Sequence, residues 1–287
     1  MNDNRADIAI CNHNDPGYEQ LFDDLIREVF GFSFAPWFKR ELWNEQYESY
    51  SIIRDGVMLS NVCVFKTDMV VQGKKLRAHQ FGGVATRIGE RGKGYSRQLM
   101  EYALAKYPDT PAFLFANPSV VAFYPRFGFR QAQPYRPSIA VEINNETSGA
   151  VKHGSDSETL LKSLYSERIY SDQVDCLNTQ SVQIFHLLLD YADCIYYLPD
   201  SKAFVIAEQD GHDLFIADII THKTMTFDEI KPGLPFSGVK RAEFGFCPEW
   251  LGILPDWEPI DADKEPFFIY GEWELPDKYR FPSMSAT

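Results

Sequence analysis

The segment Arg91–Ser96, with the sequence RGKGYS, combines residue types that suit the binding of an anion. Gly92 and Gly94 leave successive backbone N–H groups unobstructed by a Cβ atom. A helix is predicted from about residue 94 to 106, and a helix start offers unpaired N–H groups and a partial positive charge. The nearby basic residues are Arg91, Lys93 and Arg97. The segment therefore predicts a phosphate or pyrophosphate site. An ordinary strand-to-helix turn is the alternative, because glycine-rich turns are common.

Two familiar phosphate motifs do not fit this segment. A P-loop would close with Gly-Lys-Ser or Gly-Lys-Thr, and the glycines here are not spaced as in the dinucleotide fingerprint. A second informative stretch, FLFANPSVVAFYPRFGF, follows at residues 113–129. It predicts a short buried strand, followed by Asn117 and a short helix that ends at Gly128.

Together the two stretches resemble motifs A and B of the GNAT superfamily of N-acetyltransferases. Arg91 and Gly94 match the Gln/Arg-x-x-Gly-x-Gly/Ala pattern, with Gly92 and Lys93 at its two variable positions. Phe123-Tyr124 with Gly128-Phe129 match the end of motif B. Ser96 departs from the family's glycine or alanine, but it is small and keeps its own backbone N–H, so we expect the loop to form. The order and spacing of both motifs make the resemblance more specific than either motif alone, and it covers residues 1–145.

The resemblance implies acetyl-CoA as co-substrate, lying between two central strands that separate. The strand before the loop would bind the pantetheine amides, and the N–H groups of residues 92–97 would hold the pyrophosphate. The residues expected to bind the cofactor are Val84, Ala85, Thr86, Arg91, Gly92, Lys93, Gly94, Tyr95, Ser96, Arg97 and Asn117. An acceptor amine would attack the thioester directly. Tyr124 would protonate the departing thiolate as general acid, with a buried packing tyrosine as the alternative.

The general base is predicted less sharply. His79, on the strand leading to the loop, is the catalytic candidate, and a structural histidine is an equal alternative. Glu90 and the carboxylate of Thr287 are further candidates, and a chain of water molecules is another route for the proton.

The elements that must position these residues follow from the sequence pattern. Residues 18–30 place apolar side chains on one helical face, and residues 51–86 are rich in β-forming residues broken by turn signals. The aromatic segment 32–50 predicts either a helix packed on a core or the lining of an acceptor pocket. The residues expected to bind the substrate are Phe34, Trp37 and Phe38.

Residues 146–157 are polar and predict a linker between two units. The first, 1–145, would be the catalytic GNAT-like domain. The second, 158–287, has a helix, three strands, a short helix and two strands, and lacks a Gly-x-Gly turn. That order resembles a degenerate second GNAT-like domain. The expected fold class is α+β, with a mixed, mostly antiparallel sheet flanked by helices, followed by a smaller second α+β domain.

The formal net charge of −13 lies in the second half of the chain. Residues 1–150 hold 17 basic and 17 acidic residues, whereas residues 151–287 hold 11 and 24. This balance argues against nucleic acid and an anionic membrane surface as partners. The acidic half either keeps the protein soluble or attracts a cationic acceptor, such as a polyamine, an aminoglycoside or a basic peptide.

The five cysteines are scattered and odd in number, which predicts reduced thiols in the cytoplasm. Neither they nor the six histidines have the spacing of a metal site, and the N-terminus lacks the pattern of a signal peptide. We therefore expect an acetyl-CoA-dependent N-acetyltransferase that acts on a small-molecule amine or peptide, without a metal. A non-catalytic acyl-CoA sensor is the alternative, and the sequence leaves the oligomeric state open.

Overall fold

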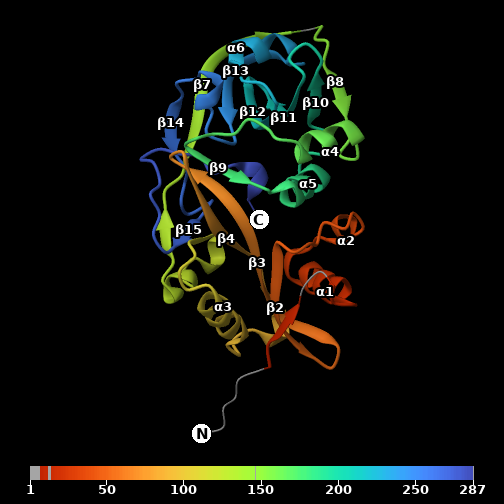
Figure 1. Cartoon of the computed structure of the whole chain (residues 1–287), viewed down its shortest axis with the longest axis vertical. Coiled ribbons are helices and arrows are strands. Elements are labelled where there is room, and N and C mark those ends of the chain that lie inside the picture. The colour runs from red at the N-terminus through yellow and green to blue at the C-terminus, as the bar shows by residue number, and fades with distance from the viewer. Residues whose placement is uncertain (1–6, 12–13, 146, 287) are drawn as a thin grey trace.

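The computed structural model describes residues 7–11, 14–145 and 147–286. Within these ranges the chain forms two β-sheets, one in each half of an elongated molecule (Figure 1). Antiparallel pairs dominate both sheets, and each sheet contains one parallel pair. The expected α+β class with mostly antiparallel sheets is confirmed.

The first sheet has the order β1-β2-β3-β4-β5-β15-β6, and β9 pairs with one end of β3. Its long central strands carry buried residues on both faces, because helices cover both sides of the sheet. The bounds are β1 (Ala9–Cys11), β2 (Tyr47–Arg54), β3 (Val57–Val71), β4 (Lys74–Thr86), β5 (Ala112–Phe115), β6 (Arg130–Ala132), β9 (Val174–Leu177) and β15 (Phe267–Tyr270).

The second sheet has the order β14-β7-β13-β12-β11-β10-β8. β12 and β13 form its parallel pair, as β4 and β5 do in the first sheet. The short strand β8 lies inside the predicted linker and pairs with β10. The bounds are β7 (Tyr135–Asn144), β8 (Val151–His153), β10 (Ile195–Leu198), β11 (Ala203–Asp210), β12 (Asp213–Ile220), β13 (Ser237–Phe244) and β14 (Asp256–Pro259).

The two sheets exchange a strand. β7 follows β6 along the chain but lies between β13 and β14 in the second sheet. β15 follows β14 but lies between β5 and β6 in the first sheet. Each sheet therefore depends on residues from both halves of the chain, and the division at residues 146–157 stays a prediction.

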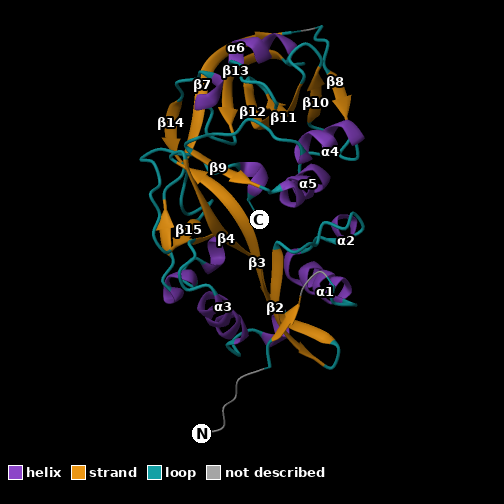
Figure 2. Ribbon diagram, viewed as in Figure 1, coloured by secondary structure: helices purple, strands orange, loops and turns teal. Residues whose placement is uncertain are grey.

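Helices lie on both faces of the first sheet (Figure 2). α1 (Tyr18–Phe30) and the short α2 (Ala35–Phe38) pack on one face, and α3 (Tyr95–Lys106) packs on the other. α1 and α3 match the helices expected from the sequence. The helices of the second half are α4 (Glu158–Tyr165), α5 (Gln180–Leu189) and α6 (Phe227–Ile230). None of the helices among the described residues combines the length and apolar character required to cross a membrane.

Candidate active site

The strands β4 and β5 separate beside a bulge. They pair at His79–Ala112 and Gln80–Phe113, and no further pair is formed along these strands within the described residues. On its other side, β4 has two residues, Gly83 and Val84, opposite one residue of β3. Gly83 has a φ of +55°, in the left-handed region that glycine adopts readily. The separation and the bulge leave backbone groups of β4 facing a gap in the sheet.

Asn61 of β3 supports this bulge from a fully buried position. Its Nδ2 donates a hydrogen bond to the carbonyl oxygen of Gly83 (3.0 Å). Its Oδ1 accepts hydrogen bonds from the hydroxyls of Ser49 and Ser51. The direction of the Gly83 carbonyl is thus set by a buried polar group of the neighbouring strands.

The loop after β4 has the shape expected of an anion site. Gly92 and Gly94 have φ values of +79° and +83°, and no atom would contact a Cβ added at either position within 4 Å. Gly94 caps the N-terminus of α3. The unexpected Ser96 turns its hydroxyl to the hydroxyl of Thr86 (2.6 Å), at the end of β4. The serine therefore ties strand to helix, and the loop keeps its glycine-based shape.

The motif B segment forms short 3₁₀ turns instead of one helix. Asn117 caps the first turn, and its side-chain oxygen accepts hydrogen bonds from the backbone N–H and hydroxyl of Ser119. Only its amide NH₂ group is left as a donor for a ligand. Tyr124 begins the second turn, Tyr124–Phe127.

Tyr124 is 5% exposed, and its ring packs on Phe129 and on Phe268 of β15 (5.6 Å between the latter centroids). Its hydroxyl makes no hydrogen bond within the described part of the chain. Burial raises the pKa of Tyr124 to about 12, so the phenol keeps its proton near neutral pH. Since β15 is the exchanged strand, the second half of the chain helps to hold this side chain.

One cavity of about 1400 Å³ joins the bulge, the glycine loop and Tyr124. The predicted cofactor residues that line it are Val84, Thr86, Arg91, Gly92, Gly94, Tyr95, Ser96, Arg97 and Asn117. Two of the predicted substrate residues, Phe34 and Trp37, line it as well. The structure thus brings together most of the residues that the two motifs singled out.

Four predicted residues are not part of the lining. Ala85 is buried against the α1 side of the sheet, and the ammonium of Lys93 pairs with Glu90 (2.8 Å). Phe38 lies behind the lining, packed edge-on against Trp37 (5.3 Å between centroids). His79 is the fourth.

His79 is 3% exposed and points to the side of the sheet that α3 covers. Its ring packs edge-on against Tyr107 (4.3 Å between centroids), beyond the end of α3. Burial and the nearby Lys66 ammonium lower the pKa of His79 to about 4. Its place favours the alternative of a structural histidine over a general base.

The far end of the cavity is built of aromatic and aliphatic side chains. Val182, Phe185 and Leu189 of α5 form an apolar stripe at helical spacing, but nothing in the sequence connects this helix with the site. The structure brings that stripe onto the cavity, because Trp37 Nε1 donates to the carbonyl oxygen of Ser181 (2.8 Å). Phe32, Trp43 and Tyr47 of the aromatic segment 32–50 also line the cavity, in agreement with the expected pocket. The apolar lining residues that the sequence did not assign to a site are Phe22, Ile26, Val29, Phe30, Cys63, Phe65, Phe115, Val182, Phe185 and Leu189.

The C-terminal segment lies between α5 and the first sheet (Figure 1). Met284 is buried in the core, and the backbone N–H of Ser283 donates to the carbonyl oxygen of Gly245 (2.7 Å). A ring nitrogen of His186 donates to the carbonyl oxygen of Ala286 (2.6 Å). Thr287, one of the candidate bases, lies outside the described residues.

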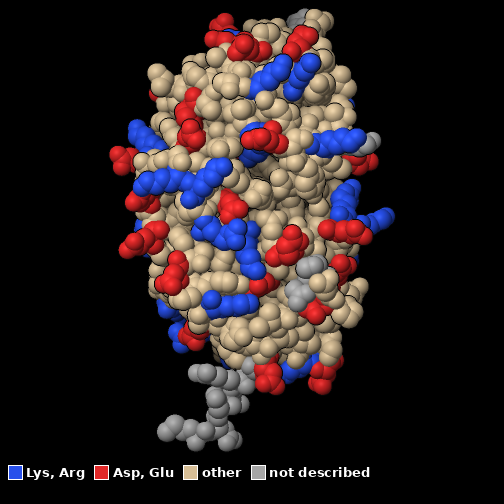
Figure 3. Space-filling view, viewed as in Figure 1, with Lys and Arg blue, Asp and Glu red and all other residues tan. Residues whose placement is uncertain are grey.

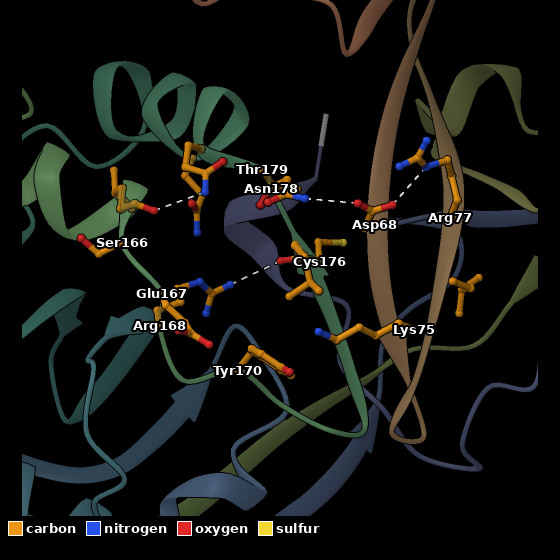
Figure 4. Close-up of a pocket in the computed structure, with 15 residues that line it drawn as sticks. Asp68, Lys75, Arg77, Ser166, Glu167, Arg168, Tyr170, Cys176, Asn178 and Thr179 are labelled. Carbon is orange, nitrogen blue, oxygen red and sulfur yellow. Dashed lines mark hydrogen bonds and ion pairs between the residues drawn. The ribbon is translucent and has the colours of Figure 1, made fainter.

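A second cavity of about 760 Å³ lies between the β3–β4 hairpin and the segment before α5 (Figure 4). Its basic side chains are already engaged: Arg168 pairs with Asp175, Arg77 pairs with Asp68, and the ammonium of Lys75 lies 5.8 Å from the ring centroid of Tyr170. It shares no lining residue with the first cavity. None of the predicted site residues belongs to it.

The acidic excess of the second half is not concentrated in the first cavity. Among the described residues that line it, the carboxylates are Glu90 and Asp190. Figure 3 shows acidic and basic side chains interspersed over the visible face.

Residues 15–132 match the family described as acetyltransferase (GNAT) domain. No curated protein matches the sequence. The matched range contains the bulge, the glycine loop and Tyr124.

Solved structures share the fold across both halves. Eis1 from Mycobacterium abscessus has a TM-score of 0.60 and 14% identity, covering 92% of this chain and 73% of its own. A conserved protein of unknown function from Enterococcus faecalis V583 has a TM-score of 0.60 and 16% identity, with 92% and 71% covered. A GCN5-related N-acetyltransferase from Anabaena variabilis has a TM-score of 0.56 and 13% identity, with 92% and 72% covered. At these identities the likeness concerns the fold, and the family assignment rests on the matched domain. Residues 15–132 belong to the GNAT acetyltransferases, and the protein is an acyltransferase that takes its acyl group from acyl-CoA.

Proposed function

We propose that the protein transfers the acetyl group of acetyl-CoA to a primary amine by direct attack, with Tyr124 as general acid. The observation that carries the proposal is the single cavity shared by the β4 bulge, the glycine loop and the Tyr124 side chain. A protonated phenol at the gap between two separated strands is suited to meet a departing thiolate.

The residues present fit acetyl-CoA. The N–H groups around Gly92 and Gly94 and the start of α3 would hold the pyrophosphate, with Arg91 and Arg97 nearby. The bulge at Gly83 and Val84 would offer backbone groups to the pantetheine arm, and the amide of Asn117 would be a further donor. Acetyl-CoA supplies the activated acyl group, and the chain supplies position and a proton.

The proton balance needs no strong base on the protein. The acceptor ammonium first loses a proton to water, and the neutral amine then forms the new C–N bond as the C–S bond breaks. Tyr124 gives its proton to the sulfur, and the proton released from the new amide nitrogen returns to the phenolate through water. The raised pKa of Tyr124, about 12, makes the phenolate short-lived, so the residue is ready for the next turnover.

In this proposal the second half of the chain completes the first sheet with β15 and lines part of the cavity with α5. Its strand succession β10-β11-β12-β13, with a parallel last pair, repeats that of β2-β3-β4-β5. This repeat supports a GNAT-like unit. The unit would be degenerate, because the segment 221–226 after β12 has no glycine to form a phosphate loop. The free thiols fit the reducing cytoplasm as the place of action.

The test is release of CoA from acetyl-CoA in the presence of primary amines, with Tyr124→Phe as the variant. We expect kcat to fall by about 10²- to 10³-fold because the general acid is lost. The dissociation constant of acetyl-CoA should stay within about twofold, since the ring remains. Phe123→Tyr in the Tyr124→Phe background is the matched control, because it restores a phenol at the neighbouring position without restoring activity.

An unchanged kcat in Tyr124→Phe would contradict the role of Tyr124. Tight binding of acetyl-CoA with no release of CoA for any amine would favour the sensor function instead.

A further inference from the structure

The cavity has two chemically different ends. One end, around the glycine loop, carries the guanidinium groups of Arg91, Arg97 and Arg126 and suits the phosphates of the donor. The other end, formed by α1, α2, β2, β3 and α5, is lined almost entirely by apolar side chains. The bulge at Gly83 lies at their junction, because a Cβ there would meet the Phe22 ring at 3.4 Å. The apolar end is therefore next to the place where the acyl group would be held.

Two of the aromatic residues in this end have their polar atoms engaged by α5, whereas the buried Nε1 of Trp43 has no hydrogen-bond partner among the described residues. The hydroxyl of Tyr47 lies 2.8 Å from the hydroxyl of Ser181, and the indole N–H of Trp37 donates to the Ser181 carbonyl oxygen. With these groups engaged by α5, the rings present apolar surface to a ligand.

Phenylalanines from both halves of the chain form another part of the lining of the apolar end. Phe34 stacks on Phe185 with 4.9 Å between ring centroids and 22° between planes, and Phe32 meets Phe185 edge-on at 5.9 Å. Phe34 also contacts Phe22, at 5.3 Å. A planar or aliphatic group placed here would contact rings from α1, the segment before α2, and α5.

The two lining carboxylates already have partners. Glu90 pairs with Lys93 in the loop, and Asp190 Oδ2 lies 2.6 Å from Nδ1 of His186. A polyamine would bring several ammonium groups into the apolar end, where burial of an unpaired charge is costly. A monoamine brings one ammonium, and apolar surroundings lower the pKa of that group. The same surroundings therefore help to supply the neutral nucleophile.

We infer that the acceptor is a primary amine on an apolar body, preferably an aromatic ring, which binds among Phe34, Trp37 and Phe185 with its nitrogen at the bulge. This inference rests on the proposed N-acetyltransferase function and names the substrate class of the same cavity.

The experiment compares kcat/KM for 2-phenylethylamine, ethanolamine and spermidine at fixed acetyl-CoA. We expect 2-phenylethylamine to be preferred by at least about tenfold over both, since transfer of a ring to an apolar site is strongly favourable. In Phe185→Ala the efficiency with 2-phenylethylamine should fall by about tenfold, and that with ethanolamine by less than twofold. Leu254→Ala, at a side chain that is 97% exposed, is the control and should leave the preference unchanged.

Thermal unfolding and the affinity for acetyl-CoA show whether Phe185→Ala is folded, and Phe185→Leu replaces it if it is not. Equal or greater efficiency with ethanolamine or spermidine would overturn the inference and leave the proposed function standing. A tenfold preference for octanoyl-CoA over acetyl-CoA, with no effect of the amine body, would also overturn it, because the apolar end would then hold the acyl chain. If no amine releases CoA although acetyl-CoA binds, both proposals fail.

Discussion

Tyr124 and His79, the two side chains predicted to transfer protons, lie in different environments. Tyr124 faces the cavity with its phenol protonated, and His79 is enclosed between the sheet and Tyr107. The sequence could place each on its element but could not say toward which face His79 points. The bulge at Gly83 changes the face to which successive β4 side chains point, and a bulge is not readable from residue alternation alone.

The buried His79 predicts a pH-dependent stability. Its pKa in the folded state, about 4, is below the ordinary value of 6.5, so the unfolded chain binds a proton more readily. The stability is present above pH 6.5 and is lost as the pH falls toward 4. We expect the free energy of unfolding to fall by about 2 kcal/mol between pH 7 and pH 5 through this residue. Urea titrations of the wild type and His79→Gln at both pH values measure the difference, and equal losses in the two proteins would contradict it.

At the scale of single elements, the sequence correctly predicted the helices and turns whose pattern lies within the element itself. The apolar face of 18–30 and the Gly-x-Gly start of α3 lie within one helix or turn, and both elements form as expected. The stretch CLNTQSVQIFHLLLDYA, residues 176–192, predicts a helix over its whole length. Cys176 and Leu177 instead end β9, because pairing with Met69 and Asp68 of β3 overrides the local pattern. Contacts of this kind depend on residues about a hundred positions away.

The bulge in β4 depends on one side chain of β3. Asn61→Ala would remove the side-chain donor to the Gly83 carbonyl and the acceptor shared by the hydroxyls of Ser49 and Ser51, all in a buried place. We expect a loss of about 3 kcal/mol in the free energy of unfolding, together with weaker binding of acetyl-CoA. Asn144→Ala, which removes one exposed hydrogen bond to Gly238, is the control and should cost less than about 1 kcal/mol.

Urea unfolding and calorimetric titration with acetyl-CoA measure the two effects of Asn61→Ala. Unchanged acetyl-CoA affinity in a destabilised variant would show that Asn61 serves the fold alone.

For the whole molecule, the two sheets are completed by each other's half of the chain. The sequence suggested a boundary at 146–157 from composition, but composition carries no information about which sheet a strand joins. β7 is a ten-residue strand in which polar and apolar residues mix, and β15 is a four-residue apolar strand. Each follows a strand of the opposite sheet, and neither local pattern says which sheet the strand joins.

The exchange predicts that residues 1–145 do not fold alone. That fragment lacks β15, so β5 and β6 lose the strand between them and Tyr124 loses its contact with Phe268. We expect the fragment to show no cooperative thermal transition. The full chain should show one transition, with equal calorimetric and van't Hoff enthalpies.

The matched control is the full chain cut at a protease site inserted after Gly149, an exposed position. It should keep the single transition, because all strands remain present. A cooperative transition in the isolated fragment would show that the first half is autonomous.

The exchanged strand also has a consequence for synthesis on the ribosome. β6 ends at Ala132, and its partner β15 begins at Phe267. The place between β5 and β6 is therefore filled only after more than a hundred further residues have been translated. At about 5–20 residues per second, the nascent chain exposes the open edge of β5 for roughly seven to thirty seconds. An unpaired strand edge invites pairing with other chains. The protein is therefore most exposed to aggregation during translation, and a chaperone that binds extended apolar segments would find its target at Ala112–Phe115.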